Sequence, residues 1–237
     1  MATARFRFYG DLAAFLPRTR RDLAFAYDCA RAATLKNAIE ALGVPHTEPG
    51  AIVVNGRNAT LQRIVREGDT IEVYPWTRQP VAGRPQFVAD AHLGGLARFL
   101  RMLGYDTLHE NAIADREIRR LAQEERRIVL TRDRELLKCR EVRRGAYVHA
   151  RKAEEQLREV ASRFGLAQHA RPFTLCLACN LSLRPAHPDS VAARIPERIR
   201  ARYVRFSECP GCGGVFWEGS HFARMREALA RNLELPS

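Results

Sequence analysis

Four acidic residues in the middle of the chain are the side chains best suited to do chemistry. They are Asp90, Asp115, Glu117 and Asp133. Asp90 directly follows the apolar run Phe87–Ala89, and Asp133 follows the run Ile128–Leu130 after two further residues. Parallel α/β sheets bind ligands beyond the carboxyl ends of their strands, so we expect acids placed there to converge. Carboxylate oxygens suit hard cations, and the pattern predicts a Mg²⁺ or Mn²⁺ site for phosphate chemistry.

The same acids also fit local positions in helices. Asp115 and Asp133 each stand at the start of a helical pattern, where an aspartate can accept hydrogen bonds from free backbone N–H groups. Asp90 could cap the helix that begins near Leu93, and Glu117 fits a first helical turn, where the macrodipole favours acids. For Asp115 and Asp133 both interpretations stay open. We favour a functional role for Asp90 because it ends the first strand of the expected sheet.

Two pairs of cysteines have the spacing of metal knuckles. They are Cys176 with Cys179, and Cys209 with Cys212. Two residues between the members of a pair let both thiolates bind one tetrahedral ion, so the four cysteines predict a closed, structural Zn²⁺ site. The gap between the pairs is longer than in usual ribbons, and we expect an inserted hairpin or loop at 182–205. The N-terminus lacks a signal-peptide core, which argues against disulfides.

Four further cysteine and aromatic residues are expected to have structural roles. Cys29 and Cys139 stand alone in the sequence and are expected to be ordinary thiols. Phe216 and Trp217 follow the second knuckle, where they either pack the small ribbon or stack on bases. We favour packing, because a ribbon of this size has little other core.

Arginine dominates a strongly basic composition. The net charge is +12 and the pI is about 10.1. Such a charge favours nucleic acid as a partner, because binding to a polyanion releases counterions. A merely solvated basic surface is the alternative. Arg98 and Arg101 share one helix flank, which is either solvated or in contact with phosphate or the site acids. Together with Arg132, they are the predicted nucleic-acid contacts.

The first part of the chain, residues 1–78, is expected to be a small α+β domain. Its predicted strands lie at 4–9, 22–28, 51–54 and 70–74, and its predicted helix lies at 35–42. The dipeptide Asn55-Gly56 is a strong hairpin signal after the third strand. The resulting β-β-α-β-β order is that of the β-grasp fold. Residues 75–85 contain several prolines and are expected to form a linker.

The rest of the chain changes character twice. Residues 85–168 alternate between predicted strands (86–89, 106–109, 127–130, 146–149) and predicted helices (92–103, 115–124, 133–138, 153–164). This alternation predicts an α/β domain with a parallel sheet. Residues 171–237 hold the cysteine pairs and a predicted terminal helix at 220–233.

The stretch IVVNGRNATLQRIVREGDTIEVYP resembles the ubiquitin-like sulphur carriers of thiamine and molybdopterin synthesis. Those proteins act through a free C-terminal Gly-Gly pair. Here the segment continues into Pro75–Pro80 instead. The resemblance therefore implies the β-grasp fold and a structural or docking role, not sulphur chemistry.

Four later motifs resemble the Mut7-C RNase family. They are FVADAHLGGLARFLRMLGYD, ADREIRRLAQEERRIVLTRDREL, CLACN and CPGCGGVFWEGSH. That family joins a PIN-like nuclease domain to a C-terminal zinc ribbon, often behind a ubiquitin-like domain. The resemblance implies an α/β protein with three parts: a ubiquitin-like β-grasp domain (1–78), a PIN-like nuclease domain with a parallel sheet (85–168), and a Cys₄ zinc ribbon with a C-terminal helix (171–237).

The resemblance further implies a Mg²⁺- or Mn²⁺-dependent ribonuclease. Asp90 and Asp133 would bind the catalytic metal, and Asp115 or Glu117 would complete its shell or orient the attacking water. The alternative is a non-catalytic RNA-binding or ribosome-associated adaptor, with the β-grasp domain docking a protein partner. Since the sequence has neither an export signal nor an apolar run long enough to span a membrane, we expect a cytoplasmic protein.

PIN domains often carry one more acid after the next strand. In this chain that region reads VHARKAEEQL, so Glu154 or Glu155 is the nearby candidate for a fourth acid.

Overall fold

A computed structural model describes residues 1–81 and 83–233 of the chain. Its packing divides the chain into two compact units, and each is described by itself. The first unit combines residues 1–81 with residues 113–149, and the second combines the described residues of 82–112 and 150–237. Within the described part of the chain, no helix is both long enough and apolar enough to cross a membrane.

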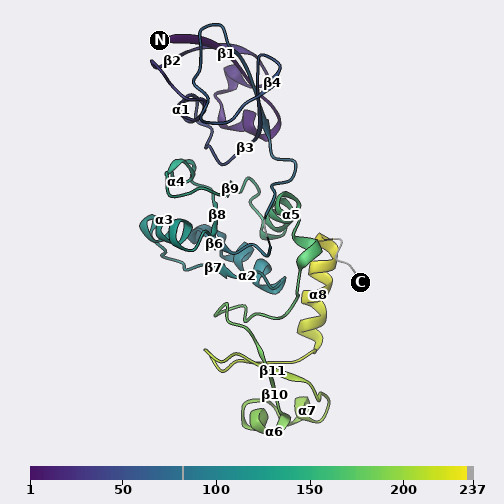
Figure 1. Cartoon of the computed structure of the whole chain (residues 1–237). Coiled ribbons are helices and arrows are strands. Elements are labelled where there is room, and N and C mark those ends of the chain that lie inside the picture. Colours follow the sequence, from purple (N-terminus) through teal and green to yellow (C-terminus); the bar gives the residue numbers. More distant parts are fainter. Residues whose placement is uncertain (82, 234–237) are drawn as a thin grey trace. The chain divides into compact units, whose positions relative to one another are not determined.

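The first unit begins with a five-stranded sheet and one α-helix (Figure 1). Its elements are β1 (Ala2–Phe8), η1 (Gly10–Phe15), η2 (Arg18–Arg20), β2 (Phe25–Cys29), α1 (Leu35–Ala41), β3 (Pro49–Val54), β4 (Arg57–Asn58) and β5 (Thr70–Pro75). The strand order is β2-β1-β5-β3-β4, with β1 parallel to β5 and the other pairs antiparallel. The predicted β-grasp arrangement is therefore confirmed.

Local sequence signals explain the ends of these elements. The Thr34 side chain caps α1 by accepting a hydrogen bond of 3.2 Å from the Asn37 N–H. Asn55 and Gly56 both have positive φ, as a tight hairpin turn requires. The second strand starts at Phe25 rather than at the predicted Asp22, because Asp22 has a φ of 59° and cannot continue a strand.

Alternating side chains of the β-grasp sheet fill one apolar core. Phe6 and Phe8 of β1 and Ile71 and Val73 of β5 are buried on the face that α1 covers with Leu35, Ala38 and Ile39. Side chains alternate between the two faces of a strand, so the apolar residues of each strand lie on one face. A shift of the pairing by one residue would expose them, and the strand register is therefore fixed.

Residues 113–149 of the first unit contain two helices and two parallel strands. They are α3 (Asp115–Glu124), β8 (Ile128–Thr131), α4 (Arg134–Lys138) and β9 (Gly145–Tyr147). Val129 lies opposite Gly145, and Leu130 lies opposite Ala146. All four residues of β8 are buried, as expected for a strand of a parallel sheet. The predicted bounds of α3 agree with the structure.

The β-grasp residues pack directly on residues 134–149 within this unit. The Phe15 ring lies edge-on to Tyr147 at 5.0 Å and to His149 at 5.5 Å, between ring centroids. The Arg134 guanidinium lies 4.9 Å from the Phe15 ring centroid and donates to the Phe15 carbonyl oxygen at 3.1 Å. Polar and aromatic contacts therefore join the β-grasp residues to residues 134–149, which lie far away in the sequence.

Two further side chains join the same segments. The His46 ring lies between the Glu40 carboxylate, 2.7 Å from Nδ1, and the Val142 carbonyl oxygen, 3.0 Å from Nε2. The buried Glu48 carboxylate accepts a hydrogen bond of 3.0 Å from the Tyr147 N–H. A buried carboxylate requires such partners, so these bonds fix the contact in one arrangement.

The second unit starts with a parallel strand pair and two packed helices. Its elements up to residue 169 are β6 (Phe87–Ala89), η3 (Ala91–Leu93), α2 (Gly94–Met102), β7 (Thr107–Leu108), α5 (Ala153–Phe164) and η4 (Leu166–His169). Phe87 lies opposite Thr107, and Val88 lies opposite Leu108. Together with the β8–β9 pair, this pairing confirms the predicted parallel sheet. The expected helix 92–103 is instead a 3₁₀ turn followed by α2.

The C-terminal part of the second unit is a three-stranded antiparallel sheet with short helices. Its elements are β10 (Arg184–Ala186), α6 (Pro188–Val191), η5 (Ala192–Arg194), α7 (Glu197–Arg200), β11 (Phe206–Glu208), β12 (Val215–Phe216) and α8 (Ser220–Asn232). The region predicted as a hairpin or loop therefore holds one strand and three short helical pieces. Their small core is Val191, Ile195 and Phe206.

Candidate functional site

Asp90 lies directly after β6, at the carboxyl end of the strand. Its Oδ1 atom accepts a hydrogen bond of 2.6 Å from the Ala91 N–H, so Asp90 caps the 3₁₀ turn η3. The side chain is half-buried. Asp90 therefore both caps η3 and stands at the end of a strand, so its capping role does not exclude a functional role.

Asp133 and Asp115 differ in their local roles. Asp133 caps α4, because its Oδ1 atom accepts hydrogen bonds from the Glu135 N–H at 2.8 Å and the Leu136 N–H at 3.4 Å. Asp115 does not cap α3. The N-cap residue is Ala114, and Asp115 is an exposed first-turn residue. The capping explanation left open by the sequence holds for Asp133 and is wrong for Asp115.

Glu117 lies one turn into α3 and pairs with an arginine. Arg120 Nη2 is 2.6 Å from Glu117 Oε1, and Arg120 Nη1 is 2.5 Å from Glu124 Oε2. The hydrogen bond from Arg120 lowers the pKa of Glu117, so the carboxylate is held in its charged form. Asp115, Glu117 and Asp133 lie in the first unit and Asp90 lies in the second. The convergence of the four acids stays a prediction.

The four knuckle cysteines lie together in the second unit. Their sulphur atoms are all within 4.8 Å of one another, and Cys176 Sγ is 3.8 Å from Cys212 Sγ. Four thiolates about 2.3 Å from a tetrahedral ion would stand about 3.8 Å apart. The residues therefore fit a metal ion bound by four sulphurs, as the spacing predicted. Within the described parts of the chain, Cys29 and Cys139 are not part of this group.

Backbone N–H groups of the knuckles point at the sulphur atoms. The Cys179 N–H donates to Cys176 Sγ at 3.5 Å. The N–H groups of Cys212 and Gly211 lower the pKa of Cys209 to about 7, against the effect of burial. In contrast, hydrogen bonding to Cys212 raises the pKa of Cys179 to about 12. Donors aimed at a thiolate stabilise its charge in the way that a metal site requires.

Arg101 is a buried link between α2 and the first knuckle. The residue is 6% exposed. Its Nη1 atom donates to the carbonyl oxygens of Leu177 and Ala178, both at 2.9 Å, and its Nε atom donates to the Thr107 carbonyl oxygen at 2.9 Å. Burial lowers the pKa of the guanidinium. A solvated flank, one of the interpretations that the sequence left open, is therefore wrong for Arg101, which forms a structural link. Its RNA contact stays a prediction.

Asn180 is a second anchor of the same knuckle that sequence reasoning missed. Its Nδ2 atom donates to Asp106 Oδ1 at 2.6 Å, and its Oδ1 atom accepts from the Thr107 N–H at 3.0 Å. The residue has a φ of 62°, which asparagine tolerates better than most side chains. The position of this asparagine directly after a cysteine knuckle was the sequence signal that could have predicted its role.

The other two predicted RNA contacts have different surroundings. Arg98 is exposed on α2. Arg132 is half-buried and donates to the His149 carbonyl oxygen at 3.1 Å. Both remain predictions as RNA contacts.

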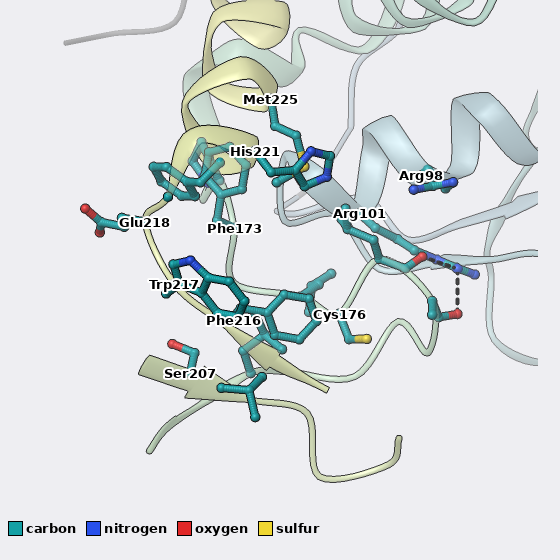
Figure 2. Close-up of a pocket in the computed structure, with 18 of the residues that line it drawn as sticks. Arg98, Arg101, Phe173, Cys176, Ser207, Phe216, Trp217, Glu218, His221 and Met225 are labelled. Atoms are coloured by element: carbon teal, nitrogen blue, oxygen red, sulfur yellow. Dashed lines mark hydrogen bonds between the residues drawn. The ribbon is translucent and has the colours of Figure 1, made fainter. Parts of the chain in front are cut away.

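An open groove of about 1740 Å³ lies beside the first knuckle in the second unit. Figure 2 shows Arg98 and Arg101 at one end of it and Phe216, Trp217 and His221 opposite. Three arginines that the sequence analysis did not single out also line it, namely Arg198, Arg202 and Arg205. Their signal was the alternation of basic and aromatic residues in RIRARYVRF.

Comparisons with known family models match the N-terminal part of the chain and the remainder separately. The family described as Mut7-C RNAse domain matches residues 85–229, and the family described as Mut7-C ubiquitin matches residues 1–81. Two solved structures of small archaeal modifier protein 1 from Haloferax volcanii are similar, at 21% and 22% identity. They cover 32% and 35% of this chain and 98% and 99% of their own, each with a TM-score of 0.26. No curated protein matches the chain.

The fold, the family matches and the four clustered cysteines together define a ubiquitin-like β-grasp domain joined to a ribonuclease-type domain whose cysteines could bind a metal ion. The match over residues 85–229 spans more than half of the sequence. The chain belongs to the Mut7-C RNase domain family.

Proposed function

We propose that this protein is a Mg²⁺- or Mn²⁺-dependent ribonuclease whose acidic site is formed by Asp90, Asp115, Glu117 and Asp133. The observation that carries the proposal is the RNase family match, because residues 85–229 contain all four acids. Asp90 and Asp133 each follow a buried strand of parallel pairing, which is where α/β proteins place ligands.

The chemistry of the donor set suits a hard divalent cation. A bound Mg²⁺ or Mn²⁺ would supply Lewis acidity and a water of lowered pKa for attack on the scissile phosphate. Asp90 and Asp133 would hold it through carboxylate oxygens. Asp115 or Glu117 would orient the attacking water, and Glu117 is already held ionised by Arg120. Exposed arginines would hold the RNA backbone without reading its sequence.

The four cysteines are proposed to hold a structural Zn²⁺. The site would be closed, since four thiolates fill a tetrahedral shell and leave no position for substrate. Arg101 and Asn180 would then tie the metal site to α2 and β7. The ion would hold together a segment whose own apolar core is small.

A direct test is cleavage of a labelled single-stranded RNA by the zinc-loaded full chain. We expect cleavage with added Mg²⁺ or Mn²⁺ and none when both are omitted. Omission is preferable to a strong chelator, which would also remove the cysteine-bound ion. Asp90→Asn keeps a side chain able to cap η3 but loses the charge, so it should slow cleavage by about 100-fold or more.

The same assay separates the nuclease from the adaptor that the sequence left open. A wild-type protein that binds RNA but never cleaves it with either cation would favour an adaptor. Cleavage at an unchanged rate by Asp90→Asn would reject the proposed site. The cytoplasmic location and a protein partner of the β-grasp domain remain proposals that rest on the sequence.

A further inference from the structure

We propose that the groove beside the first knuckle binds single-stranded RNA, with unpaired bases against its aromatic rings and phosphates on its arginines. The inference deepens the proposed ribonuclease function and rests on it for the choice of RNA. We call this surface the ribbon groove. Its walls come from α2, from residues 172–183, from α7 and the segment after it, and from β12 with the start of α8.

The ribbon groove gathers cations that have no anionic partner. Arg98, Arg198, Arg202 and Arg205 are exposed and line it, and among the residues that the structure describes none of them forms an ion pair. Arg194, nearby in sequence, differs because it pairs with Glu208 at 2.6 Å. Unneutralised like charges on one concave surface attract a polyanion and raise its local concentration.

Two glutamates are the carboxylate residues of the same lining, which also includes the knuckle cysteines Cys176 and Cys212. They are Glu110 and Glu218, and both are exposed. Four exposed arginines outnumber these two glutamates, and the buried Arg101 lies close enough to Cys176 to offset its charge. Charge alone does not distinguish a phosphate backbone from an acidic side-chain cluster as the partner of the groove. The aromatic rings described next favour the phosphate backbone of RNA.

Half-buried aromatic rings stand among these charges. Phe216 and Trp217 lie side by side in the groove, with Phe173 and His221 beyond them (Figure 2). Trp217 packs partly on the ribbon core, as the sequence analysis expected, yet it also lines the groove. Rings next to unpaired arginines are the usual surface for single-stranded nucleic acid, because every base has a face that can stack.

Phe173 is held in the groove by a strained backbone. Its φ is 61°, which is unusual for a large side chain. Its N–H donates to the Met102 carbonyl oxygen at 2.8 Å, and its ring packs on Phe222 with centroids 4.3 Å apart. Strain of this kind persists where the surroundings fix one arrangement, and it is common at ligand sites.

The rings predict selection for single strands. In a duplex the base faces are stacked on one another, so a protein meets mainly phosphates, 2′-hydroxyls and base edges. A duplex could touch the arginines but could not cover Phe216 and Trp217. We therefore expect the ribbon groove to admit unpaired RNA segments and to exclude paired ones.

Tryptophan fluorescence gives a direct readout, because Trp76 and Trp217 are the two tryptophans of the sequence. The full zinc-loaded chain carrying Trp76→Phe and Asp90→Asn reports on Trp217 without cleavage. Titration with a short oligouridylate, without Mg²⁺ or Mn²⁺, should quench this fluorescence. A duplex RNA of equal length should leave it nearly unchanged, and poly-glutamate should not compete.

Matched variants locate the binding. Arg198→Ala together with Arg202→Ala should weaken oligouridylate binding by about 10-fold or more, as should Phe216→Ala. Arg200→Ala is the control, since Arg200 is exposed on α7 but does not line the groove. Zinc content checks that Phe216→Ala is folded, and the arginine variants remain informative if it is not.

Several results would overturn the inference. They are the absence of quenching, equal quenching by duplex, competition by poly-glutamate, or equal weakening by Arg200→Ala. Failure here is separable from failure of the ribonuclease proposal. A groove that binds nothing leaves metal-dependent cleavage to be seen in the wild type, and an inactive acidic site leaves the quenching intact.

Discussion

Arg101 donates a hydrogen bond of 2.9 Å from Nη1 to the carbonyl oxygen of Leu177, within the first cysteine knuckle. This bond joins a helix of the α/β part to the four-cysteine cluster through a guanidinium that is 6% exposed. A cation buried among backbone carbonyls also balances part of the negative charge that four thiolates would bring.

Replacing Arg101 by methionine should destabilise the second unit. Three backbone carbonyl oxygens would lose their donor, which we expect to cost about 3 kcal/mol in the free energy of unfolding. Denaturant unfolding measures this loss. Arg98→Met is the control on the same helix, and its exposed side chain should leave stability within about 0.5 kcal/mol. Equal stability of both variants would contradict the structural role of Arg101.

Metal analysis should find about one zinc per chain. Cys209→Ser should lose it, while Cys139→Ser should keep it, because Cys139 is outside the group of four sulphurs. Loss of the ion should expose residues 172–216 to proteases and leave the β-grasp domain folded on its separate core. A wild-type protein without zinc, or a Cys209→Ser variant that retains it, would refute the metal site.

Glu117 and Glu124 form a matched pair for testing the acidic site. Both lie on α3 and both pair with Arg120, and their side chains are 45% and 59% exposed. Glu117→Gln should slow metal-dependent RNA cleavage by about 10-fold or more, whereas Glu124→Gln should leave the rate unchanged. Each of the two variants loses one exposed ion pair with Arg120, so the melting temperatures of the two variants should be similar. Equal cleavage rates for the two variants would show that Glu117 is not part of the acidic site.

The β-grasp domain should lose part of its stability in acid through Asp69. Arg63 donates to both carboxylate oxygens, at 2.7 and 3.0 Å, and holds the pKa of Asp69 below its ordinary value of 3.8. A group with a lowered folded-state pKa stabilises the fold above its unfolded pKa, and this contribution is lost as the pH falls through the folded value. At neutral pH, Asp69→Asn should therefore cost about 2 kcal/mol.

The cost of Asp69→Asn should shrink as the pH falls below 3.8 and through the lowered pKa of the folded state, because the wild-type carboxyl then also takes up its proton. The exposed Asp11→Asn supplies the comparison and should change little at either pH. A cost for Asp69→Asn that does not vary with pH would show that the Arg63 pair is not its cause.

The sequence predicted most of the elements because periodicity and capping are local properties. Asn55 and Gly56 form the turn after β3 as expected, and α3 and α5 have the predicted bounds. The insertion at 182–205 was less predictable, since its helices have four residues or fewer and their stability comes from a shared core.

The roles of single side chains depended on contacts between distant residues. Arg98 and Arg101 look alike in sequence, three residues apart on one helix. Arg101 is buried because the carbonyls of residues 177 and 178 fold back over it, and no local pattern records that contact. Spacing did predict the cysteine cluster, because two knuckles can share one ion in few ways.

The central claim is that the acids after β6 and β8 serve a metal-dependent nuclease, and Asp133→Asn tests it most directly. Asparagine caps a helix about as well as aspartate, so α4 and the melting temperature should be preserved. The measurement is the rate of Mn²⁺-dependent cleavage of single-stranded RNA by this variant and by the wild type. We predict a loss of about 100-fold or more in a fully folded variant. Cleavage by Asp133→Asn at the wild-type rate would contradict the account.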